Sequence, residues 1–417
     1  MNKINYKSVP IKRIGKVVTG KTPATAHKEF YDGQYMFISP TELHGGYFVK
    51  KSEKTLTEAG LKSVKSNSID GTSILVGCIG WDMGNVAMCN EKCATNQQIN
   101  SITEIKEEYN PYYVYYWLCG KKEYLFSIAS VTRIPILSKS VFEEVLVPLP
   151  EKKQQDNVVN ILLRIDKKIA LNEQINDNLE QQAKLLYDYW FTQFDFPDEN
   201  GKPYCSSGGK MVWNEQLKRN IPENWAVVPL STVFNFKSGF PFSSDLYVTK
   251  GRYKLLTIKN VQDNGINLDV DNHINDIPSN VPDYCFLKAN DILMSLTGNV
   301  GRIGIMYDYG CLLNQRVALA KPVNEDLNSF VYFLLKSDMI RKQYETIANG
   351  SSQKNLSPVE AENVLIAYNE QVANHFASFA NKYLKTIVSN LSENESLIHL
   401  RDWLLPMLMN GQASIAD

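Results

Sequence analysis

The chain has 417 residues, of which 44% are hydrophobic and 21% charged. This composition excludes a disordered chain and predicts a folded protein of two or three domains. No apolar run approaches the ~20 residues of a bilayer span, and the first residues lack the apolar core of a signal peptide. We therefore expect a cytoplasmic protein without a membrane partner.

The charge and the cysteine content give further indications of the binding partners and the compartment of the protein. The net charge is −1, yet residues 1–54 carry ten Lys and Arg against four Asp and Glu. A basic region of this kind suits phosphate contacts, although a solvated surface explains it equally well. The seven cysteines are scattered and odd in number, which indicates free thiols in a reducing compartment. The five histidines form no cluster along the sequence, and we expect no metal in this chain.

The chain repeats itself at a nearly constant spacing, a little more than half of its length. An ordered series of matches with gaps of only a residue or so indicates an internal duplication. The matching segments are Val9-Pro10-Ile11 with Val228-Pro229-Leu230, Phe37-Ile38-Ser39 with Leu255-Leu256-Thr257, Ile74-Leu75-Val76 with Ile292-Leu293-Met294, Asn96-Gln97 with Asn314-Gln315, Tyr113 to Tyr116 with Phe330 to Phe333, and Leu137-Ser138 with Leu356-Ser357.

Each copy begins with a mixed domain, predicted at 1–150 and 223–368. Short β-like runs alternate there with Gly-rich turns, and a short helix follows in each copy. The predicted runs are 35–39, 73–76, 254–258 and 291–295, and the predicted short helices are 111–119 and 328–337.

Each copy ends in a long helix, predicted at 151–193 and 369–412. Residues 156–191 and 372–405 contain no Pro or Gly, and their apolar residues recur alternately after four and three positions. This is the heptad pattern of a coiled coil. The segment between the copies, 194–222, is rich in Gly, Pro and Ser, and we expect it to be an irregular linker.

Four asparagines interrupt the two heptad seams at equivalent places, namely Asn172, Asn176, Asn390 and Asn394. In an antiparallel pair the numbers of facing residues have a constant sum, and 566 pairs Asn172 with Asn394 and Asn176 with Asn390. We predict an antiparallel coiled coil whose polar centre sets the register. One pair fits poorly, since Ile165 would face Arg401. The alternative is two amphipathic helices on separate cores.

Several segments resemble the specificity subunits of Type I restriction–modification enzymes. Residues 290–304, which contain Asp291-Ile292-Leu293 and end in a glycine-rich turn with Arg302, resemble a strand of their target recognition domains. Residues 350–357 resemble the loop that closes such a domain. Residues 368–371 resemble the start of the family's conserved helix, and 397–411 resemble its end. The first copy departs at 71–76, which has an extra residue, and at 131–135, which replaces the Ser-Gln-Asn loop.

The resemblance implies an α+β fold. Two mixed α/β target recognition domains in a pseudo-twofold arrangement would be separated by a long antiparallel two-helix coiled coil. It also implies a subunit without an active site that reads double-stranded DNA and docks onto two DNA adenine methyltransferase subunits and ATP-driven restriction subunits. S-adenosylmethionine, ATP and Mg would belong to those partners. About 35 helical residues at ~1.5 Å each make a rod of ~50 Å, so two unlike half-sites with an unread gap between them are expected.

Two other functions compete with this interpretation. Asn110-Pro111-Tyr112-Tyr113 approaches the motif of amino-methyltransferases, but the second proline is missing, and Asn followed by Pro is an ordinary helix start. No glycine-rich nucleotide loop or P-loop is present in the sequence. A scaffold whose units bind ligands other than DNA is the third possibility.

DNA contacts are expected from polar and basic residues of loops at one end of each domain. A structural role is favoured for Asn96-Gln97 and Asn314-Gln315, because residues shared by both copies cannot distinguish two half-sites. The candidates are Lys21, Thr22, Thr41, Trp81, Asp82, Asn85 and Arg133 in the first copy, and Lys237, Lys259, Asn260, Asn299, Arg302, Ser352, Gln353 and Lys354 in the second.

Overall fold

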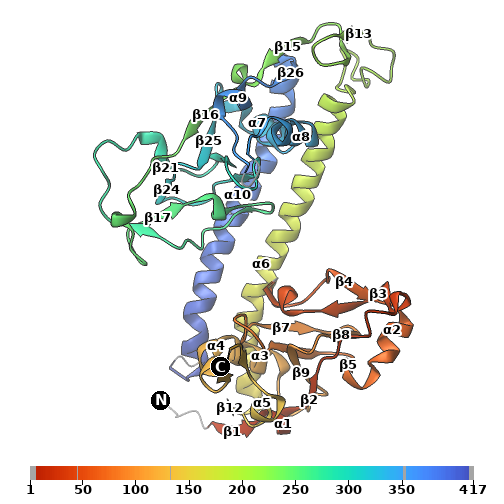
Figure 1. The fold of residues 1–417 in the computed structure, drawn as a ribbon, viewed down its shortest axis with the longest axis vertical. Helices are drawn as coiled ribbons and strands as arrows, with labels where there is room; N and C mark the ends of the chain where they lie inside the picture. Colours follow the sequence, from red (N-terminus) through yellow and green to blue (C-terminus); the bar gives the residue numbers. More distant parts are fainter. Residues whose placement is uncertain (1–5, 45, 132, 351–353, 413–417) are drawn as a thin grey trace. The chain divides into compact units, whose positions relative to one another are not determined.

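The computed structural model describes residues 6–44, 46–131, 133–350 and 354–412. These residues form two compact units. The first unit comprises the chain up to Ile169 and the segment from Leu397 onward, and the second comprises Ala170–Ser396. Both long helices cross from one unit into the other, so each unit contains one part of each helix (Figure 1).

The first unit is a mixed α/β domain. Its strands are β1 (Lys7–Pro10), β2 (Lys16–Thr19), β3 (Tyr31–Ile38), β4 (Lys54–Leu56), β5 (Ser68–Ile69), β6 (Ser73–Gly77), β7 (Val86–Cys89), β8 (Cys93–Thr95), β9 (Ile99–Thr103), β10 (Ser130–Val131), β11 (Pro135–Ile136) and β12 (Leu146–Leu149). Its helices are α1 (Ile11–Ile14), α2 (Glu58–Ser63), α3 (Pro111–Cys119), α4 (Lys122–Ser127), α5 (Lys139–Glu143) and the beginning of α6 (Lys152–Tyr187).

The second unit is also a mixed α/β domain. Its strands are β13 (Met211–Asn214), β14 (Arg219–Pro222), β15 (Ala226–Pro229), β16 (Phe234–Ser238), β17 (Tyr253–Leu256), β18 (Val261–Gln262), β19 (Gly265–Ile266), β20 (His273–Ile274), β21 (Phe286–Leu287), β22 (Ile292–Ser295), β23 (Ile303–Ile305), β24 (Cys311–Leu313), β25 (Val317–Pro322) and β26 (Leu365–Tyr368). Its helices are α7 (Asn328–Leu335), α8 (Asp338–Ile347), α9 (Pro358–Glu362) and most of α10 (Glu370–Met409).

Sheet topology repeats between the two units. One four-stranded sheet has the order β2-β9-β6-β7 in the first unit and β16-β25-β22-β23 in the second. The other has the order β4-β3-β8-β5 and β20-β17-β24-β21. In both copies of this second sheet the central pair is parallel, β3 with β8 and β17 with β24. The duplication read from the sequence is therefore confirmed strand by strand.

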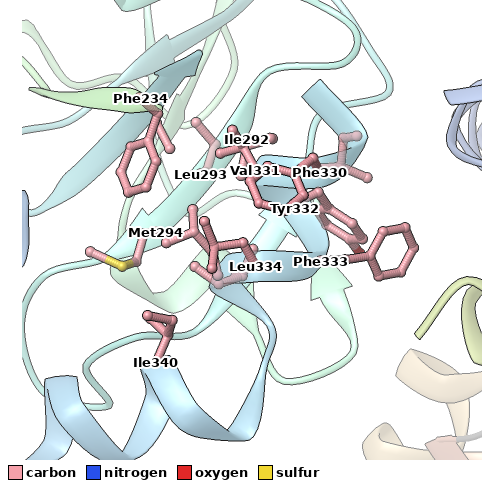
Figure 2. Packing of buried hydrophobic residues seen from close by; sticks show 14 of the residues in the cluster. Phe234, Ile292, Leu293, Met294, Phe330, Val331, Tyr332, Phe333, Leu334 and Ile340 are labelled. Carbon is pink, nitrogen blue, oxygen red and sulfur yellow. The ribbon is translucent and has the colours of Figure 1, made fainter. Parts of the chain in front are cut away.

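The core of each domain lies between a sheet and the short helix that follows it. Figure 2 shows this packing in the second unit, where Phe234 of β16 and Ile292 of β22 lie near Val331 of α7. The central strands β6 and β22 are buried along their whole length. Since these strands carry no accessible polar side chain, ligand contacts fall to the loops at their ends.

The segment predicted as an irregular linker is a structured part of the second unit. Strands β13 and β14 pair as an antiparallel hairpin. Phe194 and Phe196, which precede it, are buried, and their rings lie 5.1 Å and 5.3 Å from that of Trp225. Gly, Pro and Ser content favoured a linker, but burial of these aromatic side chains outweighs that local tendency.

The long helices pair antiparallel through the predicted asparagines. In the second unit Asn172 Nδ2 donates to Asn394 Oδ1 at 2.9 Å, and Asn390 Nδ2 donates to Asn176 Oδ1 at 2.8 Å. Both pairs have the index sum of 566 that the sequence predicts. Asn172 and Asn394 are buried, and the rings of the predicted seam pair Trp190 and Phe376 lie 6.1 Å apart.

Arg401, the residue that fits the predicted seam poorly, has a charged partner. It pairs with Asp166, the residue that follows Ile165, and its Nη1 lies 3.0 Å from the carboxylate. The Tyr116 hydroxyl of α3 donates to the same carboxylate at 2.5 Å. Burial opposes the charge of Arg401, but attraction and hydrogen bonding to Asp166 outweigh it and raise the pKa of Arg401. Helix α3 is thus anchored to both long helices of the first unit.

The second unit anchors its short helix through a different network. Lys336, at the end of α7, forms an ion pair with Glu180 of α6, and the Tyr332 hydroxyl donates to Glu180 at 3.1 Å. Burial disfavours the charge of Lys336, whereas Tyr332 and Glu180 outweigh burial and raise its pKa. Each short helix therefore docks through a hydroxyl, a carboxylate and a cation, but the two networks use non-equivalent positions.

Candidate nucleic-acid interface

The loop between β6 and β7 collects candidates of the first unit. It carries Trp81, Asp82 and Asn85. Asn85 Oδ1 accepts from Lys122 of α4 at 2.9 Å, and its Nδ2 lies 3.1 Å from Nε2 of His44. Lys122 and His44 thus hold a polar loop in place without burying it.

Trp81 projects from this loop with 72% of its surface exposed. Its ring stacks on Phe126 at 5.9 Å between centroids, which fixes its orientation. An exposed, held aromatic ring offers a stacking surface to a base or a sugar. Thr41 is also exposed and lies in the 3-10 segment Pro40–His44, whose last residue reaches Asn85.

In each unit a main-chain hydrogen bond joins the loop that closes the domain to the loop between two strands, which is β6–β7 in the first unit and β22–β23 in the second. In the first unit the Gly80 amide donates to the Pro135 carbonyl at 3.0 Å, which brings the segment of exposed Arg133 to the β6–β7 loop. In the second unit the Gly298 amide donates to the Lys354 carbonyl at 2.9 Å. Two loops that are far apart in the sequence thus share one surface in each unit.

Lys21 and Thr22 follow β2 at a point where two backbone segments nearly touch. A Cβ on Gly20 would lie 2.1 Å from the Asn96 carbonyl oxygen, and a Cβ on Gly239 would lie 2.2 Å from that of Asn314. Only glycine fits so close an approach. Thr22 donates to Gln97 at 2.7 Å. The close backbone approach and this hydrogen bond together position the exposed Lys21.

In the second unit Asn299, Arg302 and Lys354 line one cavity. Arg302 donates to Asp263 at 2.8 Å. Lys237 of β16 and Lys259 are exposed elsewhere on this unit. A hydrogen bond from Lys259 to Asp271 raises the pKa of Lys259. Ser352 and Gln353 lie outside the described residues.

Asn260 is a wrong candidate. Its side chain is 5% exposed, and its hydrogen bonds are internal. Its Oδ1 accepts from the amide and hydroxyl of Thr257, and its Nδ2 donates to the carbonyls of Asn267 and Asp269. A polar residue in a predicted loop favoured DNA contact, but the side-chain oxygen of Asn260 belongs to a capping box and its amide donates to main-chain carbonyls.

The shared asparagines and Asn110 have internal partners too. Asn96 Nδ2 donates to Gln98 at 3.0 Å, and Asn314 Nδ2 donates to the Tyr247 hydroxyl at 3.4 Å. Asn110 caps α3, since its Oδ1 accepts from the Tyr112 amide at 2.9 Å. This is the helix-start geometry expected from Asn followed by Pro.

Metal sites, disulfides and membrane-spanning helices are other features that a chain of this composition could carry. Across the described ranges, no group of three His, Cys, Asp or Glu side chains could hold a metal ion. All seven cysteines are free thiols, as predicted, although Cys89 Sγ and Cys93 Sγ lie 3.6 Å apart. None of the helices that the structure places combines the length and apolar character needed to cross a bilayer.

Two copies of one mixed α/β domain, each followed by a long helix, define a duplicated-domain protein with polar loops on each copy. Known proteins share this organisation. The profile of the Type I restriction modification DNA specificity domain matches residues 3–181 and 222–392. The chain therefore belongs to this family and carries its domain twice. The general role of the family is the recognition of DNA sequence.

Individual relatives resemble the whole chain. The Type I restriction enzyme MjaIX specificity subunit of Methanocaldococcus jannaschii is 25% identical over 98% of this chain and 93% of its own length. The MjaVIII specificity subunit of the same organism is 27% identical over 82% and 77%. The crystal structure of the S subunit of a Type I restriction–modification system from M. genitalium has a TM-score of 0.59 at 18% identity, covering 100% and 98% of the two chains. That likeness establishes a shared fold.

Proposed function

We propose that this chain is the non-catalytic specificity subunit of a Type I restriction–modification complex. Its two units read an asymmetric bipartite site in double-stranded DNA. Adenine methylation and DNA cleavage are the work of partner methyltransferase and restriction subunits, which supply the sites for S-adenosylmethionine, ATP and Mg. Asn110, the residue of the methyltransferase-like motif, is occupied as a helix cap, which favours a subunit that reads rather than modifies DNA.

One observation supports the recognition of a bipartite DNA site. The two units share a fold, but equivalent positions of their strand-to-strand loops carry unlike side chains. Trp81 in the first unit corresponds to Asn299 in the second, and Asn85 corresponds to Arg302. Since side chains at base edges specify sequence, equal folds with unlike loops read unlike half-sites.

The test of this proposal is hydroxyl-radical footprinting of the assembled complex on its methylation site. We expect two protected patches separated by an unprotected gap. Trp81→Ala should weaken protection of one patch, and Asn299→Ala should weaken the other. A single unbroken patch, or equal loss from both patches in either variant, would contradict two independent reading units.

A second duplicated feature supports two copies of one protein partner. Leu185 on α6 and Trp403 on α10 occupy equivalent positions of the two copies and are 70% and 59% exposed. Large apolar side chains with such exposure mark interaction surfaces when they recur at one place on a fold. We propose that each lies in a docking site for one methyltransferase subunit.

Charged substitutions test this docking one site at a time. Leu185→Glu and Trp403→Glu should each remove one of two partner copies, because a carboxylate in an apolar contact is costly to desolvate. Native mass spectrometry of the assembled complex would show the loss. Leu171→Glu, at an exposed position whose equivalent is the polar Ser389, is the matched control and should retain both copies. Two bound copies in both test variants would contradict this assignment.

A further inference from the structure

A cavity of about 290 Å³ lies beside the β22–β23 loop of the second unit. Two glycines of this loop, Gly298 and Gly301, have φ of +77° and +80° and bend the main chain at the cavity edge. Four cationic side chains and two carboxylates line the space, namely Arg302, Lys336, Arg341, Lys354, Asp263 and Glu345. Lys336 is paired with Glu180 of α6, so a formal excess of one positive charge remains at the cavity.

The cations are held in place before any ligand arrives. Arg302 is fixed by Asp263 at 2.8 Å, and Arg341 Nε lies 3.3 Å from the Glu345 carboxylate. Lys354 Nζ donates to the main-chain carbonyl of Glu345 at 3.1 Å. Because this carbonyl is neutral, the contact holds the ammonium group in place but does not compensate its charge. Donors arranged in advance lose little conformational entropy when they bind an anion.

The surroundings of this loop differ between the two copies. Arg302 corresponds to Asn85 in the first unit, because the two residues directly precede the equivalent strands β23 and β7 and their carbonyls accept equivalent main-chain hydrogen bonds. In the first unit Lys122 of α4 lies against the loop, since a Cβ on Gly84 would lie 2.9 Å from Lys122 Cα and Cγ. A Cβ on the equivalent Gly301 would have its nearest such neighbour at 3.7 Å, so the space beside the second loop is a divergence between the copies.

Size and charge select the ligand class. The volume is at the lower limit of pockets that enclose drug-sized molecules, and its lining is dominated by charged groups. A compact anion fits these properties better than a base or another aromatic ligand. Arginine forks and lysine ammonium groups are the donors that bind phosphate oxygens in proteins.

We infer that this cavity binds a phosphate group, held by Arg341 and Lys354 with Arg302 at its rim. Building on the proposed function, the phosphate is one from the backbone of the DNA that the second unit reads. Binding of this phosphate next to Asn299 would fix the register of the duplex against the β22–β23 loop. Phosphate contacts set the position of a protein on DNA, whereas contacts to base edges determine which sequence it recognises. A free phosphate ion has the same chemistry, and the experiment separates the two sources.

The first arm measures binding of the full chain to a fluorescein-labelled duplex of random sequence over a range of KCl concentrations. Arg341→Gln should reduce the slope of log K against log salt by about one, the effect of one lost phosphate contact. Lys342→Gln is the matched control, since Lys342 is the next residue of α8, is also exposed and lines a different cavity. It should leave the slope unchanged.

The second arm measures thermal unfolding of the full chain in inorganic phosphate and in chloride at equal ionic strength. Phosphate stabilisation that Arg341→Gln abolishes and Lys342→Gln retains supports the cavity as a phosphate site, even if the DNA slope is unchanged. In that case the ligand is the free ion. Equal DNA slopes together with equal phosphate stabilisation in wild type and Arg341→Gln would overturn the inference.

A third variant guards against a trivial loss of folding. Asp263→Asn removes a lining carboxylate and raises the positive charge of the cavity, so phosphate stabilisation should increase and DNA binding should tighten. A chain that binds phosphate in this way but no DNA at any salt concentration would contradict the proposed function and leave the phosphate site standing. Weaker phosphate stabilisation in Asp263→Asn would count against the site itself.

Discussion

Arg401→Ala should destabilise the first unit by about 3 kcal/mol, because it leaves Asp166 buried beside Tyr116 without its cation. Asp166 is 4% exposed, so water cannot replace the lost partner. Hydrogen exchange of the full chain gives the local readout. Amides of α3 should exchange roughly 100-fold faster in the variant, since every 1.4 kcal/mol is a factor of ten, whereas amides of α7 should be unaffected.

The second unit provides the matched control for this prediction. Phe333, Leu384 and Ala183 occupy the positions equivalent to Tyr116, Asp166 and Arg401, and all three are buried. Transferring this apolar set to the first unit as Tyr116→Phe, Asp166→Leu and Arg401→Ala should restore most of the lost stability. Buried ion pairs are often replaced by apolar groups without a net cost. A triple variant as unstable as Arg401→Ala would show that the network is not what anchors α3.

Lengthening both helices should abolish modification of the original DNA site. Seven residues inserted after Ile169 in α6 and seven before Leu397 in α10 preserve the heptad seam and add about 10 Å. That length corresponds to roughly three base pairs and also changes the helical phase of the half-sites. Adenine methylation by the assembled complex should therefore disappear at the original site, and any site still modified should have a longer gap.

The control is an insertion of the same length outside the helices. The turn at Asp198–Lys202 precedes the β13–β14 hairpin, and seven residues inserted there should leave the modified site unchanged. Continued methylation of the original site after the double helix insertion would contradict the coiled coil as the element that sets the gap.

The duplication and the helix register could be predicted from the sequence because both depend on periodicity. The constant spacing between the copies and the heptad pattern survive divergence of individual residues. Asn172 and Asn394 stand out as polar residues in an apolar seam, and a buried polar pair specifies one alignment. The structure places them within hydrogen-bonding distance.

The sequence did not reveal contacts that depend on tertiary packing. Asp166 is a charged residue one position off the predicted seam, which is typical of an exposed position, yet Arg401 and Tyr116 bury it. Asn260 is a polar residue of a predicted loop, which favoured DNA contact, and only the fold brings the Asn267 carbonyl close enough to accept from its side chain. Arg341 was missed because no sequence spacing connects α8 with the β22–β23 loop.

The most direct test of the proposed bipartite recognition is methylation mapping by long-read sequencing of a host with and without this chain, in the presence of the proposed methyltransferase partner. We predict modified adenines in one motif that appears only with the chain. That motif should consist of two short, unlike half-sites separated by an unread gap of fixed length. A single continuous motif, two identical half-sites, or an unchanged methylation pattern would contradict the account.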